Sequence, residues 1–375
     1  MLASDISVAC IAGKSSRGPW PQIDVPLTRE HIIETSAGES LIVVDSHTAG
    51  EPTRVVLNGL DSLPGATLSE RSHALHARHP RLISAVVGEP RGWAPWHAVV
   101  PVQPDDPRAD IAVLIFSALG QLDMCGHALI GTVTTLIEEG VVAASEPTTE
   151  LTVQTGAGLV RVAATVERGR VRHVSFENAA SYAFATDKVV AVPGLGEVRY
   201  DLAYGGLWYA VADASSLGLA IALDQVHRLM ALSERIRAAI NASLPEHPDE
   251  PDGPTFVPQL LWTTTEGARS GTNLATSTQL GFDRSPCGTG SSARTAILHA
   301  AGALAIGDTF DHHSVLGTTF TTEVVRKLVL PSGRPAITPR VTGSAWITAR
   351  SELVFRNDDP LADGSFVPPF DTDGP

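Results

Sequence analysis

Cysteine is scarce in this chain. Its 375 residues include three cysteines, Cys10, Cys125 and Cys287. An odd number of widely spaced cysteines cannot form the framework of a disulfide-rich protein, and no Cys-x-x-Cys spacing indicates zinc or a dithiol redox pair. Each cysteine therefore needs its own explanation. Cys10, in a segment without regular hydrophobic spacing, is best interpreted as a small apolar residue.

Positive charge and long apolar runs are also lacking. The net charge is −14, and no stripe of basic residues alternates with aromatic ones, so we expect no nucleic-acid partner. No apolar run approaches the roughly 20 residues that a membrane-spanning helix requires. The stretch ISVACIAG, close to the first residue, lacks the basic flank and the length of a signal peptide. These absences predict a cytoplasmic protein without a membrane partner.

The apolar sequence that is present suffices for more than one core. With 375 residues, 43% of them hydrophobic, two domains are the default expectation. Residues 1–40 are rich in serine, glycine, proline and charge, and we expect them to form an N-terminal extension. The core is expected to begin at residues 41–57, LIVVDSHTAGEPTRVVL, which predict a strand, a Gly-Glu-Pro turn and a second strand.

Two segments share one pattern, a Cys-Gly pair that opens an amphipathic helix. After Cys125, apolar residues repeat at helical spacing over 129–137, and Gly140 suits a left-handed cap. After Cys287, apolar residues repeat in the same way over 293–301. Strand-like segments precede each cysteine, so we infer a distant internal duplication of one α/β unit.

A cysteine at the start of a helix is suited to acid–base chemistry. The unpaired backbone N–H groups and the positive end of the helix dipole favour the thiolate, and the same N–H groups can bind a carboxylate. Two such helix ends facing one site could hold a carboxylate and present one thiol to each face of the adjoining carbon. Inversion of that carbon needs such a pair of groups, one thiolate and one thiol.

The simpler alternative is that both cysteines merely pack in the core. The repetition of the Cys-Gly helix start argues against it. Inversion by two thiols needs no electron-sink cofactor. The chain has three lysines, Lys14, Lys188 and Lys327, and none lies in an obvious pyridoxal-phosphate setting. We therefore expect no cofactor and no metal.

These segments resemble the proline racemase family, which includes proline racemase, 4-hydroxyproline 2-epimerase and trans-3-hydroxyproline dehydratase. The resemblance extends from about residue 42 to about residue 367. The matching segments are DSHTAGEPTRVV, EPRG, MCGH, YGG with ASSLGL, DRSPCGTG, LGTTF, TGSAWIT and DDPLADG. The paired segments MCGH and DRSPCGTG are its most specific part.

The resemblance implies an α/β (α+β) fold similar to that of diaminopimelate epimerase. Two pseudo-symmetric domains would each place a curved mixed β-sheet around a central helix, with the active site between them. The first domain would comprise residues 41–175 plus about 340–375, and the second 176–339. A homodimer is also implied. We further expect a ligand-dependent closure of the two domains, because it would exclude water and strengthen the helix-end electrostatics around a carbanion.

The resemblance also implies roles for individual residues. Cys125 and Cys287 would be the two acid–base residues. Backbone N–H groups at the two helix starts would hold the substrate carboxylate, and the side chains of His127 and Asp283 would lie near the ring nitrogen. The residues that would bind substrate are Gly126, His127, Asp283, Gly288 and Thr289.

We therefore predict a cofactor-independent racemase or epimerase that inverts the α-carbon of proline or a hydroxyproline. The first alternative is a trans-3-hydroxy-L-proline dehydratase. Family dehydratases carry threonine at the second cysteine position, so Cys287 favours inversion. The stretch YGGLWYAVADASSLGL resembles proline racemases and dehydratases more than 4-hydroxyproline epimerases. A more remote alternative is a non-catalytic protein that binds an imino acid.

Two departures from the family pattern concern the expected pocket. After EPRG, relatives usually have histidine and then Asp-Met, whereas this chain reads WAPWHAVV and places Trp93 and Trp96 where pocket lining is expected. Before the first cysteine, Gln121 and Asp123 replace the Tyr-x-Asn of relatives. A carboxylate so close to Cys125 is expected to raise the pKa of the thiol. Another cyclic imino acid could therefore be the substrate.

Several weaker patterns suggest other chemistry. Gly288, Gly290 and Ala293 fit a dinucleotide fingerprint with Asp308 downstream, but no buried strand precedes them. The histidines at 73, 76 and 79 could bind a metal, although a solvated helix explains them better, and the pair at 312 and 313 is no stronger. His47 could line the site or brace its loop.

Overall fold

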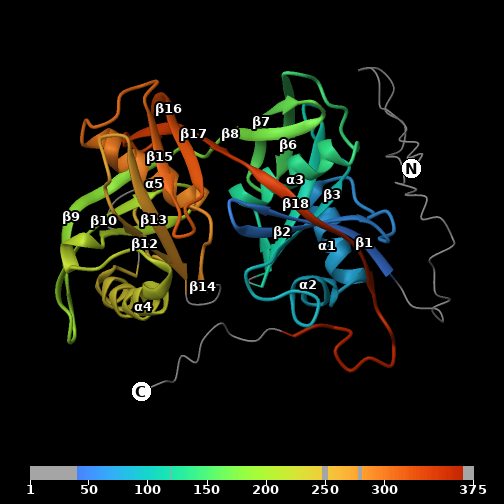
Figure 1. The fold of residues 1–375 in the computed structure, drawn as a ribbon, viewed down its shortest axis with the longest axis horizontal. Helices are drawn as coiled ribbons and strands as arrows, with labels where there is room; N and C mark the ends of the chain where they lie inside the picture. The colour runs from blue at the N-terminus through green and yellow to red at the C-terminus, as the bar shows by residue number, and fades with distance from the viewer. Residues whose placement is uncertain (1–39, 119, 247–251, 278–280, 366–375) are drawn as a thin grey trace.

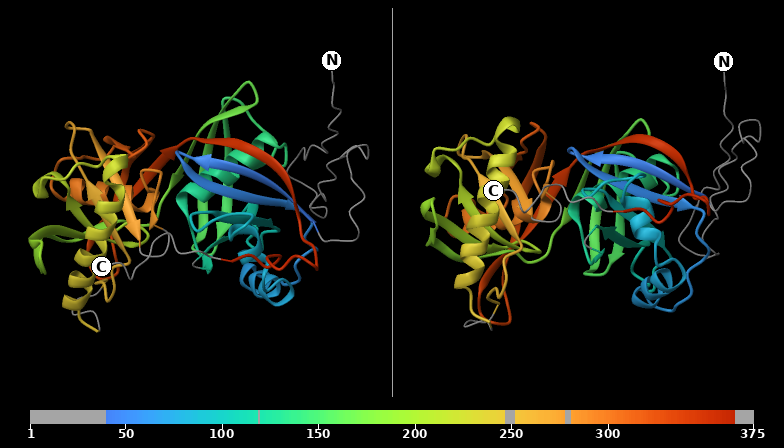
Figure 2. Two further views of the ribbon diagram at one scale, coloured as in Figure 1. Left: turned by 60° about the horizontal axis from the view of Figure 1, so that its bottom comes forward. Right: turned by 90° about the horizontal axis from the view of Figure 1, so that it is seen from below.

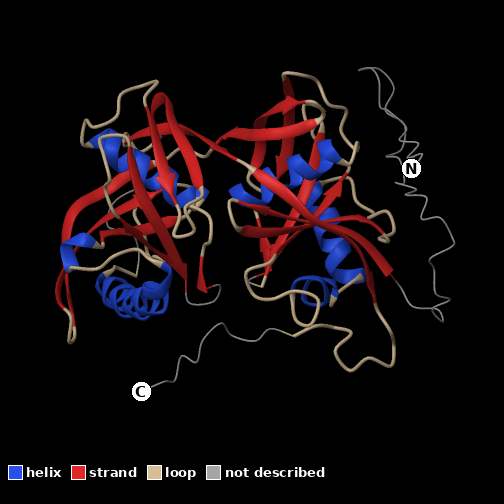
Figure 3. Cartoon of the chain, viewed as in Figure 1, coloured by secondary structure: helices blue, strands red, loops and turns tan. Residues whose placement is uncertain are grey.

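The computed structural model describes residues 40–118, 120–246, 252–277 and 281–365. Cys10 and nearly all of the expected N-terminal extension lie outside these residues. Strands dominate the fold and the helices are few, which confirms the expected α+β class (Figure 3). The elements form two halves that lie side by side (Figure 1).

The first half holds most of the N-terminal elements together with the last strand. Its strands are β1 (Ser40–Thr48), β2 (Glu51–Asn58), β3 (His97–Val102), β4 (Ile111–Ser117), β5 (Gly120–Leu122), β6 (Thr148–Thr155), β7 (Gly158–Glu167), β8 (Arg170–Glu177) and β18 (Ala345–Val354). Its helices are α1 (Leu68–Arg78), α2 (Leu82–Val87) and α3 (Gly126–Glu138).

The second half follows in sequence. Its strands are β9 (Tyr182–Val192), β10 (Gly196–Tyr204), β11 (Trp208–Asp213), β12 (Gln259–Thr263), β13 (Ser270–Ser277), β14 (Gly281–Phe282), β15 (Thr309–His313), β16 (Thr319–Val329) and β17 (Pro335–Gly343). Its helices are α4 (Val226–Ser243) and α5 (Gly288–Ala300), with short 3₁₀ turns at Ser215–Leu217 and Leu223–Gln225.

The two sheets have the same plan. In the first, the strands follow the order β18-β1-β2-β3-β4-β6-β7-β8, in which β2–β3 and β4–β6 are the parallel pairs. In the second, the order is β9-β10-β11-β12-β13-β15-β16-β17, and the parallel pairs β11–β12 and β13–β15 occupy the same places. This match confirms the predicted pseudo-symmetry. The C-terminal strand β18 completes the first sheet as β9 completes the second.

Each sheet curves around one buried helix and is covered outside by others. Helix α3 is buried along nearly its whole length, as its apolar sequence predicts, and it ends before Gly140, which takes the expected left-handed conformation. Helix α5 occupies the equivalent place among β9, β10, β16 and β17. Helices α1 and α2 cover the first sheet and α4 covers the second (Figure 1).

The halves are joined along one side. Strand β8 pairs with β17 across the boundary, and the chain passes from one half to the other after β8 and again between β17 and β18 (Figure 2). This arrangement places the inner helices α3 and α5 toward each other. Among the described residues, no helix combines the length and apolar character needed to cross a membrane.

Candidate active site

The N-termini of α3 and α5 meet where the two halves face each other. A Cβ atom added to either Gly126 or Gly288 would lie 3.7 Å from the Cα atom of the other glycine. Cys125 and Cys287 are the N-cap residues of these helices. The glycines matter here because they let two helix ends, each with unpaired N–H groups, approach backbone to backbone.

A cavity of about 600 Å³ opens at this junction and is lined by both halves. All residues that the sequence analysis assigned to the site line it: Cys125, Gly126, His127, Asp283, Cys287, Gly288 and Thr289. Further lining residues include Glu51, His97, Gln121, Asp123, Asn178, Tyr204 and Tyr209. The cavity has the size of a small-molecule site.

Cys287 lies among hydrogen-bond donors. The hydroxyl oxygen of Tyr209 is 3.2 Å from its Sγ, and the backbone N–H of Gly290 donates to the same atom over 3.4 Å. Its φ of 67° lies in the left-handed region, which is strained for a residue other than glycine and recurs at functional sites. Burial raises the pKa of the thiol to about 12, Asp283 adds to the rise, and these hydrogen bonds oppose it.

Cys125 faces an imidazole instead. Its Sγ is 3.3 Å from Nδ1 of His127, the second residue of α3. Burial raises the pKa of this thiol to about 12, although a hydrogen bond from the backbone N–H of Ala128 acts to lower it. The carboxyl groups that contribute to the rise are those of Asp283 and Glu51, although Asp123 was the group expected from the sequence.

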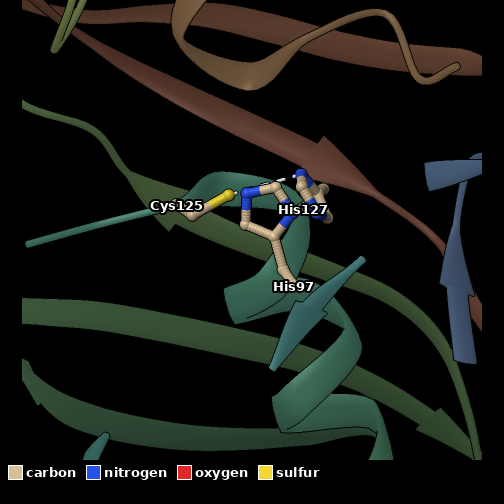
Figure 4. A group of neighbouring side chains, drawn as sticks. All are labelled: His97, Cys125 and His127. Atoms are coloured by element: carbon tan, nitrogen blue, oxygen red, sulfur yellow. Dashed lines mark hydrogen bonds between the residues drawn. The ribbon is translucent and has the colours of Figure 1, made fainter. Parts of the chain in front are cut away.

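His97 is a cavity residue that the sequence analysis missed. It begins β3, is buried, and packs edge-on against His127 with ring centroids 4.4 Å apart (Figure 4). Its Nδ1 is 3.1 Å from the carbonyl oxygen of Pro95, so this nitrogen carries the proton and donates. Burial lowers the pKa of His97 to about 4 and that of His127 well below its usual value, so both rings are neutral at neutral pH.

Two acidic side chains line the cavity, Glu51, which is buried, and Asp283, which is half-buried. Burial raises the pKa of Asp283, and burial together with Asp283 raises that of Glu51 well above the usual range. Glu51 also accepts a hydrogen bond from the backbone N–H of Arg284 over 2.7 Å, which ties the β1–β2 turn to the other half. A bound ammonium group would stabilise a carboxylate at Asp283 by supplying the missing opposite charge.

The prediction that Trp93 and Trp96 line the pocket is wrong. Neither is among the described residues around the cavity. Trp93 lies against the guanidinium of Arg284 at 4.5 Å, and Trp96 lies against that of Arg54 at 4.4 Å. Each ring finds a cation outside the cavity, and His97 is the residue of this segment that reaches inside. Its position at the start of the β-branched run HAVVPV was the available signal.

The other histidines have structural roles. His47 accepts a hydrogen bond from the N–H of Gly50 over 3.1 Å and stacks on Trp346, so it braces the β1–β2 turn. His76 packs edge-on against Phe116. Among the described residues, it belongs to no group of three or more side chains that could bind a metal ion. His312 is fully buried and lies 2.9 Å from the hydroxyl of Thr322.

The dinucleotide alternative also fails on geometry. Helix α5 follows the two-residue strand β14 and a loop that ends at Cys287, which is unlike the buried strand and tight turn of such sites. Asp308 accepts a hydrogen bond from the N–H of Ala305 and pairs with Arg269, so its carboxylate serves a local turn.

Comparisons with known proteins identify the family and the fold. The proline racemase family description matches residues 43–366. The chain is 36% identical to proline racemase of Clostridioides difficile, over 87% of this chain and 97% of that protein. It is 38% identical to 4-hydroxyproline 2-epimerase of Streptosporangium roseum, over 86% and 96%. A crystal structure of a hydroxyproline epimerase from Agrobacterium vitis, with bound trans-4-hydroxy-L-proline, superposes with a TM-score of 0.76 at 30% identity, covering 88% of this chain and 96% of that one.

Proposed function

The chain belongs to the proline racemase family and is an amino-acid racemase or epimerase, and from this premise we propose that it inverts Cα of free proline or a hydroxyproline through Cys125 and Cys287. The observation that carries the proposal is the meeting of the two cysteine-capped helix ends, α3 and α5, at one cavity. A planar carbanion held between them has one sulfur atom on each side.

Substrate binding follows from the helix ends. The carboxylate accepts hydrogen bonds from the first N–H groups of both helices, those of Gly126, His127, Gly288 and Thr289, where both helix dipoles favour negative charge. The ring ammonium lies toward Asp283, whose carboxyl group then ionises beside it. These two contacts fix the position of Cα between the sulfur atoms.

The reaction exchanges one proton for another. A thiolate on one cysteine takes the α-proton and becomes a thiol, while the thiol of the other cysteine gives its proton to the opposite face and becomes a thiolate. The negative charge that develops on the substrate is stabilised by the helix-end N–H groups in a water-poor cavity. The two cysteines exchange roles when the other enantiomer is bound. Because the helix ends stabilise the carbanion, no electron-sink group is required.

Proton NMR in D₂O tests the proposal, with L-proline, trans-4-hydroxy-L-proline and trans-3-hydroxy-L-proline offered separately and the products analysed by chiral chromatography. We expect deuterium at Cα together with the inverted configuration for at least one substrate. Loss of the 3-hydroxyl as water would instead assign dehydratase activity. Binding without exchange for every substrate would assign the non-catalytic alternative.

Cysteine variants assign the two bases. Cys125→Ser and Cys287→Ser should each lower the inversion rate by about 10²–10⁴-fold, the usual contribution of one acid–base group. Cys10→Ser, which lies before the segment that matches the family, is the matched control and should keep the wild-type rate. Substantial activity in both site variants would reject the two-cysteine mechanism.

We also propose the homodimer that the family resemblance implies. Sedimentation equilibrium of the full chain would establish it by a mass of twice the 39.4 kDa of one chain. A mass of one chain would reject it without bearing on the chemistry.

A further inference from the structure

At the N-terminus of α3, three neighbouring side chains carry atoms that could bind a metal ion. His97 comes from β3, Cys125 caps α3 and His127 lies in its first turn, and one nitrogen or sulfur atom of each lies within 4.8 Å of the others. Figure 4 shows the three side chains as neighbours, with the sulfur of Cys125 and the two imidazole rings side by side. Residues from two elements converge here, and the proposed inversion assigns no role to His97.

The donor set has the chemistry and the spacing of a zinc-type site. Zinc bonds of about 2.0–2.1 Å to nitrogen and about 2.3 Å to sulfur place neighbouring donors of a tetrahedral site roughly 3.3–3.6 Å apart. Sγ of Cys125 and Nδ1 of His127 are already 3.3 Å apart. The remaining separations are at most 4.8 Å and would have to close by up to about 1.2–1.5 Å, which side-chain rotations can supply.

A hydrogen bond to the backbone fixes the tautomer of His97. Nδ1 of His97 donates to the carbonyl oxygen of Pro95, which leaves the lone pair on Nε2. A backbone carbonyl that fixes the tautomer in this way is the usual outer partner of a metal-bound histidine.

We propose that His97, Cys125 and His127 bind one thiophilic divalent cation of the Zn²⁺ type, and that the bound cation inhibits the enzyme. On binding, the Cys125 thiol gives its proton to solvent and its sulfur bonds to the metal. The inhibition rests on the proposed role of Cys125 in inversion, whereas the binding does not.

Cobalt titration tests the binding directly. Co²⁺ added to the purified full chain should give one equivalent of a thiolate-to-cobalt charge-transfer band in the near ultraviolet, and Zn²⁺ should remove it by displacement. Mg²⁺ should have no effect because it prefers oxygen ligands. Absence of the band at saturating Co²⁺ would reject the site, whether or not the protein racemises any substrate.

Variants assign the ligands. His97→Phe and His97→Gln should each weaken Co²⁺ binding at least tenfold, and Cys125→Ser should abolish the thiolate band. His73→Gln removes an exposed histidine of α1 and is the matched control, with unchanged binding expected. Circular dichroism checks that the variants fold. Wild-type affinity in both folded His97 variants would reject the three-ligand site.

Activity assays test the consequence. Zn²⁺ should inhibit inversion by the wild type, a chelator should restore it, and the His97 variants should require at least tenfold more Zn²⁺ relative to their own uninhibited rates. A full cobalt band without inhibition of an active enzyme would reject the inhibitory role. Inhibition that is equally strong in the His97 variants would place the inhibitory metal elsewhere.

Discussion

At the scale of single residues, the two thiols differ in what surrounds them. Cys287 accepts hydrogen bonds from a hydroxyl and a backbone N–H, both of which stabilise a thiolate. Cys125 lies against the neutral imidazole of His127, whose Nδ1 can accept a proton from the thiol. Both thiols are protonated at neutral pH, because burial raises the pKa of each to about 12. The hydrogen bonds to Cys287 make it the better stabilised thiolate once a proton is lost, and the inversion requires one thiolate beside one thiol.

The pH dependence of the reaction follows from the raised thiol pKa values. Because burial places the pKa of both cysteines at about 12, the base is almost fully protonated at neutral pH. We expect kcat/KM to rise with pH by close to tenfold per unit across about pH 6–9, since the thiolate fraction rises in that proportion. Steady-state kinetics at constant ionic strength measure it. A maximum below about pH 8 would contradict the assignment of a thiolate base with so high a pKa.

Removing the tyrosine hydroxyl beside Cys287 should slow the reaction. Burial raises the pKa of Tyr209 well above its usual value, so this residue remains a phenol that donates. A hydrogen bond to a charged group contributes about 1.5–3 kcal/mol, so Tyr209→Phe should lower kcat/KM about 10- to 100-fold. The slope with pH should persist to higher pH, because the pKa of Cys287 rises.

Tyr200→Phe is the matched control for Tyr209→Phe. Tyr200 is also buried, but it lies in β10, outside the cavity lining, and its hydroxyl bonds to Ser243. Stability should change similarly in both variants, while kcat/KM should fall in Tyr209→Phe alone. Equal losses of activity would mean that the Tyr209 hydroxyl acts through folding.

At the scale of elements, the sequence was sufficient for the helices that carry the site. The regular apolar spacing after each cysteine predicted α3 and α5. The β1–β2 hairpin was also predicted, but its turn is shorter than expected: it lies at Ala49 and Gly50, and Glu51 and Pro52 already pair in β2. Strand order was beyond reach, because β18 pairs with β1 across nearly the whole chain and no local pattern encodes that pairing. His97 was missed for the same reason, since it reaches His127 through the parallel pairing of β2 and β3.

Gly205, at the end of β10, allows the first turn of α5 to pack closely against the backbone. A Cβ atom at Gly205 would lie 2.1 Å from the carbonyl oxygen of Thr289 and 2.5 Å from the backbone nitrogen of Ala293. Backbone atoms cannot yield as a flexible side chain can, so Gly205→Ala must displace the first turn of α5. We expect a loss of about 1–3 kcal/mol in unfolding free energy, together with lower kcat.

Urea unfolding and steady-state kinetics measure the two effects of Gly205→Ala. Gly267→Ala is the matched control, because a Cβ atom there would meet Ser270 Oγ at 3.4 Å, an ordinary contact. Wild-type stability and kcat in Gly205→Ala would show that α5 can shift without cost.

At the scale of the whole molecule, the site exists because two halves of the same plan face each other. Cys125 belongs to one and Cys287 to the other, so their separation depends on how the halves are held. We propose that residues 41–175 with about 340–375, and residues 176–339, act as two domains that close on substrate. Closure would remove water from the cavity and strengthen the interactions of the helix ends with the carbanion.

The contact around Arg284 is suited to hold the closed arrangement. Its guanidinium lies between the ring of Trp93, 4.5 Å away in the first half, and that of Phe282, 4.4 Å away in the second. The hydroxyl of Thr318 also donates to the carbonyl oxygen of Ala49 across the same boundary over 2.7 Å. We therefore expect Trp93 to act on the site from outside the cavity, by holding the two cysteine-bearing halves together.

Trp93→Ala should consequently raise KM more than it lowers kcat. Loss of a partly exposed cation–π contact costs about 0.5–1 kcal/mol, which corresponds to roughly a two- to fivefold smaller population of the closed state. The substrate must then supply that free energy, so its apparent affinity falls by the same factor. Trp93→Phe keeps an aromatic face for Arg284 and should restore most of the wild-type KM. Small-angle scattering of the substrate-free Trp93→Ala protein should show a larger radius of gyration, and an unchanged radius with unchanged KM would mean that the interface holds without this contact.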